Sequence, residues 1–163
     1  MFNVAISKVE RFEVTLSEFE RCRLQSGDLL IVEGNGSIDQ IGRNALFSEH
    51  GEWIHQNHII RVRVVDETLS PEFVSAYLNA SAGRAQLVEK ARSTTGLYTL
   101  SAGKVASLDV PAPSLAEQRA IALRLNRDQT TAKALRDAIQ EKLDELKKLP
   151  AALLRSAFSA NGG

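Results

Sequence analysis

The stretch that decides the fold is residues 114–150, which read SLAEQRAIALRLNRDQTTAKALRDAIQEKLDELKKLP. It opens with Ser114 and Glu117 just after a proline, and this pair has the spacing of a capping box, which marks the first turn of a helix. Neither glycine nor proline interrupts residues 115–148, so we expect one helix about 50 Å long at a rise of about 1.5 Å per residue. Pro150 is expected to break or kink this helix, and residues 151–158 to form one more apolar helical segment.

Apolar side chains recur along this helix in steps of three and four residues, close to a heptad. Gln118 and Asp128 fall on the same stripe and weaken it. Such a helix can dock on its own domain or form a coiled-coil dimer. Because the preceding part of the chain is too small to cover a helix of this length, we expect a partner helix, in the simplest case from a second copy. The residues predicted to pair are Ile121, Leu125, Ala132, Leu135, Ile139, Leu146 and Leu149.

The preceding residues, 1–113, combine short predicted strands with short predicted helices. Residues 29–32 and 41–47 are predicted strands, and residues 58–65 are the clearest one, because apolar and charged side chains alternate there with the two-residue period of a strand. Residues 4–14 and 105–110 are further strand candidates. Ser17 with Glu20 has capping-box spacing, and Ser70 with Pro71 opens another helix. The sequence therefore predicts the α+β class, with a small β-rich domain over 1–113 and a long coiled-coil-type helix within 114–163.

Charge and cysteine content limit the classes of function. The chain has 20 basic and 20 acidic residues, which is not the basic excess of an autonomous nucleic-acid-binding domain. Residues 1–113 hold 11 basic and 14 acidic residues, and residues 114–163 hold 9 and 6. Cys22 is the single cysteine, so it forms no internal disulfide and a reduced cytoplasm is the simplest setting. The apolar runs are too short to span a bilayer.

Catalysis and metal binding find no support in the sequence. His50, His55 and His58 lie close together in sequence, but no thiolate or clear carboxylate completes a tetrahedral set with them. No nucleophile elbow of the G-x-S-x-G kind surrounds Ser101. We therefore predict neither an enzyme nor a metal site.

The remaining polar candidates suit DNA binding. Arginine can bridge the O6 and N7 atoms of guanine, and asparagine or glutamine the N6 and N7 atoms of adenine; residues of these types stand at predicted strand–loop junctions. A cation beside hydroxyls, as in residues 92–95, suits phosphate or base edges. For Arg61 and Arg63, pairing with an acidic residue across the sheet stays open as the alternative. The predicted DNA contacts are Arg43, Asn44, Gln56, Asn57, Arg61, Arg63, Arg92, Thr94, Thr95 and Lys104.

Several stretches resemble a known family, in that family's order. They are LQSGDLLI at 24–31, HQNHIIRVR at 55–63, PAPSLAEQR at 111–119 and LPAALLRSAF at 149–158. Together they resemble the specificity subunits of type I restriction–modification enzymes, and the third stretch, which opens the long helix, is the most specific of them.

The resemblance implies a non-catalytic, DNA-reading subunit in the cytoplasm. Residues 1–113 would be a target-recognition domain that reads one half of a bipartite site in double-stranded DNA, and residues 114–163 a conserved spacer helix. The implied partners are the modification (methyltransferase) subunit, the restriction subunit through the complex, and a second copy through the helix. No cofactor is expected on this chain, since S-adenosylmethionine and ATP would bind the partner subunits.

A complete subunit of the family carries two recognition domains and two such helices, whereas this sequence holds one helix. The resemblance therefore implies a half-subunit or a truncated subunit. The alternative is a truncated specificity-like protein that acts only as a protein–protein scaffold or a helix-mediated dimer, without reading DNA.

Overall fold

The computed structural model describes residues 3–4, 6, 9–35, 37–91 and 98–160, of which 35 and 151–160 are described in their backbone alone. Three antiparallel strands form the main sheet: β1 (Leu29–Val32), β3 (Asn44–Leu46) and β4 (Ile59–Val62). Their order is β3-β1-β4, so β1 lies in the middle. A second pair joins β2 (Gly34–Asn35) to β5 (Tyr98–Thr99). The predicted strands at 29–32, 41–47 and 58–65 are thus present, the last two shorter than expected.

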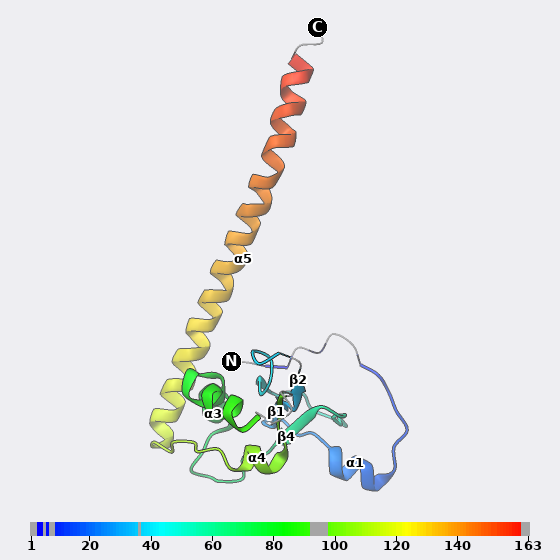
Figure 1. Ribbon diagram of the computed structural model, residues 1–163, viewed down its shortest axis with the longest axis vertical. Coiled ribbons are helices and arrows are strands. Elements are labelled where there is room, and N and C mark those ends of the chain that lie inside the picture. Colours follow the sequence, from blue (N-terminus) through cyan, green and yellow to red (C-terminus); the bar gives the residue numbers. More distant parts are fainter. Residues whose placement is uncertain (1–2, 5, 7–8, 36, 92–97, 161–163) are drawn as a thin grey trace. The chain divides into compact units, whose positions relative to one another are not determined.

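Two consecutive helices cover the sheet. They are α2 (Pro71–Asn79), whose N-cap is Ser70 with Pro71 in its first turn as predicted, and α3 (Ser81–Ala91). Leu29 and Ile31 of β1 are fully buried and pack with Val74, Leu78 and Leu87 of the two helices. Figure 1 shows α3 on one side of the strands and the N-terminal helix α1 (Leu16–Cys22) on the other, and α1 contributes no buried residue. The core of this part of the chain therefore lies between the sheet and the pair α2–α3.

Gly83 explains how closely α3 follows α2. A Cβ atom at this position would lie 2.3 Å from the backbone oxygen of Tyr77 and 2.6 Å from the Cα of Leu78. No larger residue fits at that distance without moving one helix away from the other. The glycine, which lies inside α3, therefore permits the close approach of α3 to the end of α2.

Three local predictions are wrong, two of them because a nearby side chain caps a helix. The first capping box is formed by Thr15 and Glu18, so α1 begins one residue before the predicted cap, Ser17. Residues 105–110 form no strand, because Ser101 accepts a hydrogen bond from the backbone N of Lys104 and opens α4 (Ala102–Ala106). Residues 9–14 are irregular, and all of them are exposed.

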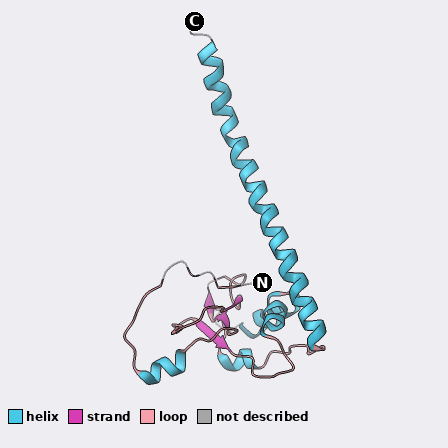
Figure 2. Ribbon diagram, turned by 180° about the vertical axis from the view of Figure 1, so that it is seen from behind, coloured by secondary structure: helices cyan, strands magenta, loops and turns pink. Residues whose placement is uncertain are grey.

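The long helix, α5, runs from Leu115 to Ala160 with Pro150 inside it, and Figure 2 draws it without a break. At about 1.5 Å per residue it is about 69 Å long. The helix therefore does not break at Pro150, and a kink there stays a prediction. The Ser114–Glu117 capping box is confirmed, because the backbone N of Ser114 donates to Oε2 of Glu117 at 3.0 Å. The α+β class, with short helices and then one long helix, is confirmed as well.

The chain divides into two compact units, Met1–Leu125 and Asn126–Gly163. We call them the first and the second unit. The first three turns of α5 thus belong to the first unit, and the rest of the helix forms the second. Within the described residues, no helix combines the length and the apolar character needed to cross a membrane.

Candidate nucleic-acid interface

The end of the central strand brings two predicted DNA-contact segments together. The backbone N of Val32, at the end of β1, donates to the carbonyl of Arg43 at 2.9 Å, and the next backbone N, that of Glu33, donates to the carbonyl of His58 at 2.9 Å. Arg43 and His58 therefore flank β1 on its two sides, about 10 Å apart for two interstrand spacings. Four of the predicted DNA contacts lie near this end of β1, and we call them the β1-end cluster: Arg43, Gln56, Asn57 and Lys104.

The side chains of Arg43, Gln56 and Asn57 are exposed. His58 adopts a φ of 70°, a left-handed conformation that is uncommon for residues other than glycine, although histidine is among those enriched there. This conformation turns the chain into β4 and leaves Gln56 and Asn57 in the turn that precedes the strand. Arg43 Nη1 also contacts Oε1 of Gln40, so its guanidinium already has one neutral partner.

Lys104 joins the cluster from a distant part of the sequence. It lies in α4, is half-buried, and its Nζ donates to the carbonyl of Thr99 at 2.9 Å. Thr99 pairs in turn with Gly34, two residues after the end of β1. The short β2–β5 ladder therefore places Lys104 near the same end of β1 as Arg43.

Asn44 lies next to Arg43 but faces the core. It is buried, and its Oδ1 accepts hydrogen bonds from Ser75 Oγ at 2.9 Å and from Asn79 Nδ2 at 3.0 Å. Among the described residues its Nδ2 finds no partner. These contacts tie β3 to α2, so in this conformation the side chain is not presented to a base edge.

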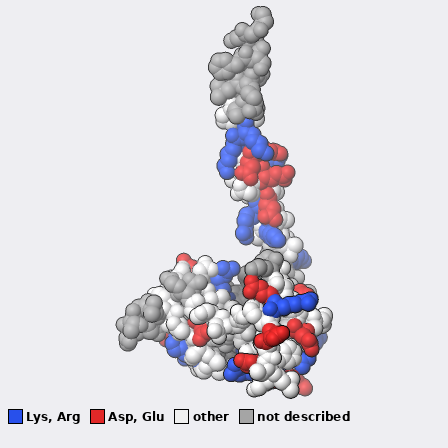
Figure 3. All heavy atoms as spheres, turned by 90° about the vertical axis from the view of Figure 1, so that its right-hand side faces the viewer, with Lys and Arg blue, Asp and Glu red and all other residues white. Residues whose placement is uncertain are grey.

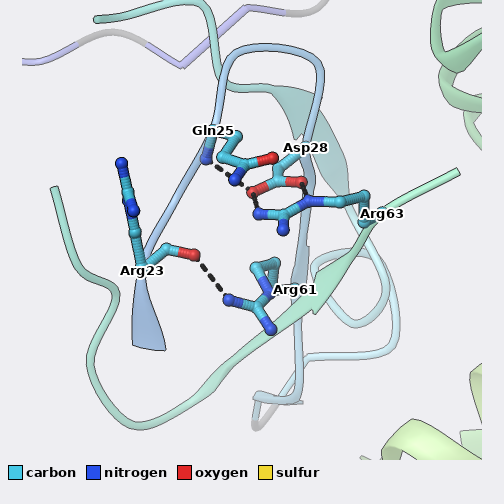
Figure 4. A network of polar contacts seen from close by, with 5 residues as sticks. All are labelled: Arg23, Gln25, Asp28, Arg61 and Arg63. Atoms are coloured by element: carbon cyan, nitrogen blue, oxygen red, sulfur yellow. Dashed lines mark hydrogen bonds and ion pairs between the residues drawn. The ribbon is translucent and has the colours of Figure 1, made fainter. Parts of the chain in front are cut away.

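Arg61 and Arg63 lie toward the other end of β1. Asp28, which precedes the strand and is only 1% exposed, accepts from Arg63 Nε at 2.7 Å and from Nη2 at 2.8 Å (Figure 4). The hydrogen bonds to Asp28 raise the pKa of Arg63 above its ordinary value. Arg61 Nη1 donates to the carbonyl oxygen of Arg23. Pairing with an acidic residue, the alternative that the sequence left open, is therefore found for Arg63, and among the described residues it is not found for Arg61.

The last three predicted contacts, Arg92, Thr94 and Thr95, lie outside the described residues. Of the ten predicted residues, the structure thus brings four together at one end of β1, places two toward the other end and buries one. On the face of the first unit drawn in Figure 3, basic and acidic side chains are interspersed among neutral ones. The described residues hold no group of histidine, cysteine, aspartate or glutamate placed to bind a metal ion.

The apolar stripe of α5 is exposed along the described part of the helix. Its exposed fractions run from 38% for Leu125 to 61% for Leu135. Every residue predicted to pair with another helix is exposed: Ile121, Leu125, Ala132, Leu135, Ile139, Leu146 and Leu149. A seam of this kind is the surface that a second amphipathic helix covers in a coiled coil.

Gln118, which the sequence suggested was a weak position in the stripe, has a different role. Its side chain is 0% exposed. Its Oε1 accepts from the backbone N of Ser70 at 2.9 Å, and its Nε2 donates to the carbonyls of Thr68 at 2.6 Å and Pro113 at 2.8 Å. The amide therefore holds the first turn of α5 on the loop before α2. Sequence periodicity gave no signal for this role, because two of the partners lie 48 and 50 residues away.

The family resemblance implied a recognition domain followed by a spacer helix, and the structure shows an α+β unit followed by one long helix. Comparison with curated proteins supports that resemblance: the chain is homologous to specificity subunits of type I restriction enzymes. No family model matches the sequence.

Two such relatives define the similarity. The chain is 26% identical over 148 residues to the EcoKI specificity subunit of Escherichia coli (strain K12), and 23% identical over 154 residues to the StySPI specificity subunit of Salmonella potsdam. These alignments cover 90% and 94% of this chain but 32% and 33% of the relatives. The chain therefore spans about one third of the length of the curated relatives that it matches.

Proposed function

We propose that this chain is a non-catalytic, DNA-sequence-reading subunit of a type I restriction–modification complex. Residues 1–113 serve as the target-recognition domain for one half of a bipartite site, and residues 114–163 as the spacer helix. The observation that carries the proposal is the similarity to two specificity subunits, which covers at least 90% of this chain and so includes both parts. Specificity subunits are themselves non-catalytic, and the single cysteine suits a cytoplasmic setting.

The β1-end cluster is the proposed base-reading surface. Its side chains have the chemistry of direct readout, because arginine pairs bidentately with guanine and the amides of glutamine and asparagine with adenine. Its two segments are about 10 Å apart for two interstrand spacings, which fits a major groove about 12 Å wide. Residues 92–95 remain candidates from their composition alone, and Lys104 supplies a cation for a nearby phosphate.

The exposed seam of α5 is the proposed assembly surface. Apolar side chains that are 38% to 61% exposed favour burial against a second helix, and a second copy of this chain offers a matching seam. A twofold pair of this kind presents two readers to the two halves of a symmetric target. In this arrangement the modification subunit docks on the pair, the restriction subunit joins through the complex, and those subunits bind S-adenosylmethionine and ATP.

Methylation-site mapping tests the proposal directly. The gene is expressed beside its modification subunit in cells, and the methylated positions are compared with those in cells that lack the gene. We expect methylation at one defined motif that depends on this chain. Methylation at the same positions in both cells would exclude the reading function.

Substitution within the reading surface sharpens that test. Gln56→Ala and Asn57→Ala should relax the motif at one or two base positions, because a bidentate amide contact contributes about 1–3 kcal/mol of discrimination. Gln140→Ala removes an exposed amide from α5 and should leave the motif unchanged. If neither Gln56→Ala nor Asn57→Ala changes the motif, the bases are read by another part of the chain.

A second candidate function is a scaffold that assembles with the modification subunit but ignores base sequence. The equal numbers of basic and acidic residues and the engagement of Arg63 by Asp28 favour it. The two candidates differ in the assembled complex. A reader binds its cognate duplex more tightly than a scrambled one, whereas a scaffold binds both equally.

A further inference from the structure

Three arginines are linked toward the N-terminal end of β1: Arg63 pairs with Asp28, and Arg61 donates to the backbone carbonyl of Arg23, as Figure 4 shows. We call them the arginine cluster. Arg61 and Arg63 come from β4 and the residue after it, and alternate residues of an extended strand point to the same face. Arg23 follows α1 and forms an isolated bridge with Ile54. The cluster therefore draws on two segments that are far apart in the sequence.

Among the described residues, Asp28 is the carboxylate that contacts the cluster. Its Oδ2 accepts from the backbone N of Gln25 at 2.7 Å, and its two oxygens hold Arg63 as a bidentate pair. Arg61 donates to a neutral carbonyl, and the Arg23 guanidinium lies 5.6 Å from the centre of the Phe19 ring. Within the part of the chain that the structure describes, neither of these two guanidinium groups has a carboxylate within 4.0 Å. The network therefore carries three positive charges and one negative charge.

The cluster is held by backbone as well as by side-chain contacts. The backbone N of Leu24 donates to the carbonyl of Trp53 at 2.8 Å, and the backbone N of His55 to the carbonyl of Cys22 at 3.1 Å. These bonds fix the segment around Arg23 against the turn that leads into β4. A ligand of the cluster therefore meets groups that are already in place, which lowers the entropy cost of binding.

We propose that Arg23 and Arg61 bind the phosphate backbone of DNA beside the groove that the β1-end cluster reads. This inference rests on the proposed function and assigns to Arg23 a role that the sequence did not suggest. Guanidinium groups match the geometry of phosphate oxygens, and the two unpaired charges of the cluster have no other anionic partner in the described structure. Asp28 is a positioning residue in this arrangement, since it occupies Arg63.

The distance along β4 between the β1-end cluster and Arg61 is suitable for one of them to contact bases while the other contacts the DNA backbone. From His58 to Arg61 the chain advances three residues, about 10 Å at 3.3 Å per residue. A major groove is about 12 Å wide. If the β1-end cluster enters the groove, Arg61 therefore lies near a phosphate at the border of that groove. Arg61 and Arg23 thus fix the register of the module on the duplex, and the β1-end cluster reads the bases.

The test is the salt dependence of DNA binding by the full chain assembled with its modification subunit. Binding constants for a cognate and a scrambled duplex are measured over a range of salt concentrations, for the wild type and for Arg23→Ala and Arg61→Gln. Glutamine at position 61 keeps an N–H donor for the Arg23 carbonyl, and thermal melting checks that each variant is folded. Each substitution should reduce the slope of log K against log [salt] by about 0.9, with the cognate-to-scrambled ratio unchanged.

Arg21→Ala is the matched control. It removes the same charge two residues away from Arg23, from an exposed side chain of α1 outside the cluster, and should leave the slope unchanged. The inference is overturned if the wild type discriminates between the duplexes while both cluster variants keep its slope, or if Arg21→Ala lowers the slope equally. It is also overturned if the cluster variants lose only the modification subunit, which would identify an acidic protein surface as the ligand. A wild-type complex that binds both duplexes equally refutes the proposed function itself.

Discussion

Replacing the buried amide of Gln118 should destabilise the first unit strongly. Leucine has a similar size but offers neither the acceptor for the backbone N of Ser70 nor the donors for the carbonyls of Thr68 and Pro113. Each buried polar group left without a partner costs about 1–3 kcal/mol. Ser70 and Pro113 are half-buried and Thr68 is exposed, so water can reach part of this site and the lower end of that range applies.

The expected loss for Gln118→Leu is therefore about 3 kcal/mol, at about 1 kcal/mol for each of the three groups. For a unit of about this size it corresponds to a fall in Tm of roughly 10 °C. Gln118→Glu should cost at least as much, because the ionised carboxylate would face the two carbonyl oxygens that now receive N–H donors. Gln140→Leu is the control, since the same substitution at an exposed position of the same helix should change stability by about 0.5 kcal/mol at most.

Tryptophan fluorescence during urea unfolding is the appropriate assay, because Trp53 is the single tryptophan and lies in the first unit. Its Nε1 donates to the carbonyl of His50 at 3.0 Å, and its ring lies edge-on to Phe47 with 6.0 Å between the ring centres. The fluorescence signal thus reports the first unit separately from the helical signal of the second. If Gln118→Leu and Gln140→Leu shift the urea midpoint equally, the amide does not hold α5 on the first unit, and the reasoning fails.

Three further outcomes follow from single contacts. Asp28→Asn should destabilise the first unit by about 2 kcal/mol in urea unfolding, below the range for a fully buried pair because Arg63 is 35% exposed; unchanged stability would contradict the pairing. The Ser114 hydroxyl and backbone N–H lower the pKa of Glu117 below 4.5, so its stabilising contribution is present above that pH and is lost as the pH falls through the folded-state pKa. Melting curves of Glu117→Ala should therefore lie below those of the wild type at neutral pH and converge with them once the pH has fallen below the folded-state pKa of Glu117. Gly83→Ala should lower the free energy of unfolding by about 3 kcal/mol through overpacking. Gly103→Ala, with open space around its Cβ, should leave it unchanged or raise it. Equal effects at both glycines in urea unfolding would contradict the close approach of α3 to α2.

Features whose partners lie within a few residues were predictable from the sequence. The helix at Pro71 begins where Ser70 caps it, and α5 begins where Ser114 and Glu117 exchange hydrogen bonds. In each case the donor and the acceptor are three residues apart, so the spacing of residue types alone indicates the contact. The same rule gave a wrong cap at Ser17, because Thr15 offered an equivalent hydroxyl with a glutamate at the required distance.

Contacts across the fold were not predictable, because no local pattern specifies the partner. Arg63 meets Asp28 across 35 residues, and Asn44 meets Ser75 across 31. Asn44 and Arg43 are neighbours in sequence, yet successive side chains of a strand point to opposite faces. One of them is therefore exposed and the other lies in the core. For this reason the sequence could predict a set of DNA contacts but could not divide it between the β1-end cluster, the arginine cluster and the core.

The burial of Gln118 also changes the length of the seam that α5 offers to a partner. Gln118 follows the same three- and four-residue spacing as the apolar stripe, but its side chain is fully used within the first unit. The exposed seam therefore starts at Ile121, and it continues at least to Leu149 within the residues whose side chains are described. A second helix that pairs along this seam would therefore meet α5 beyond its first turn, because that turn is held on the first unit through Gln118.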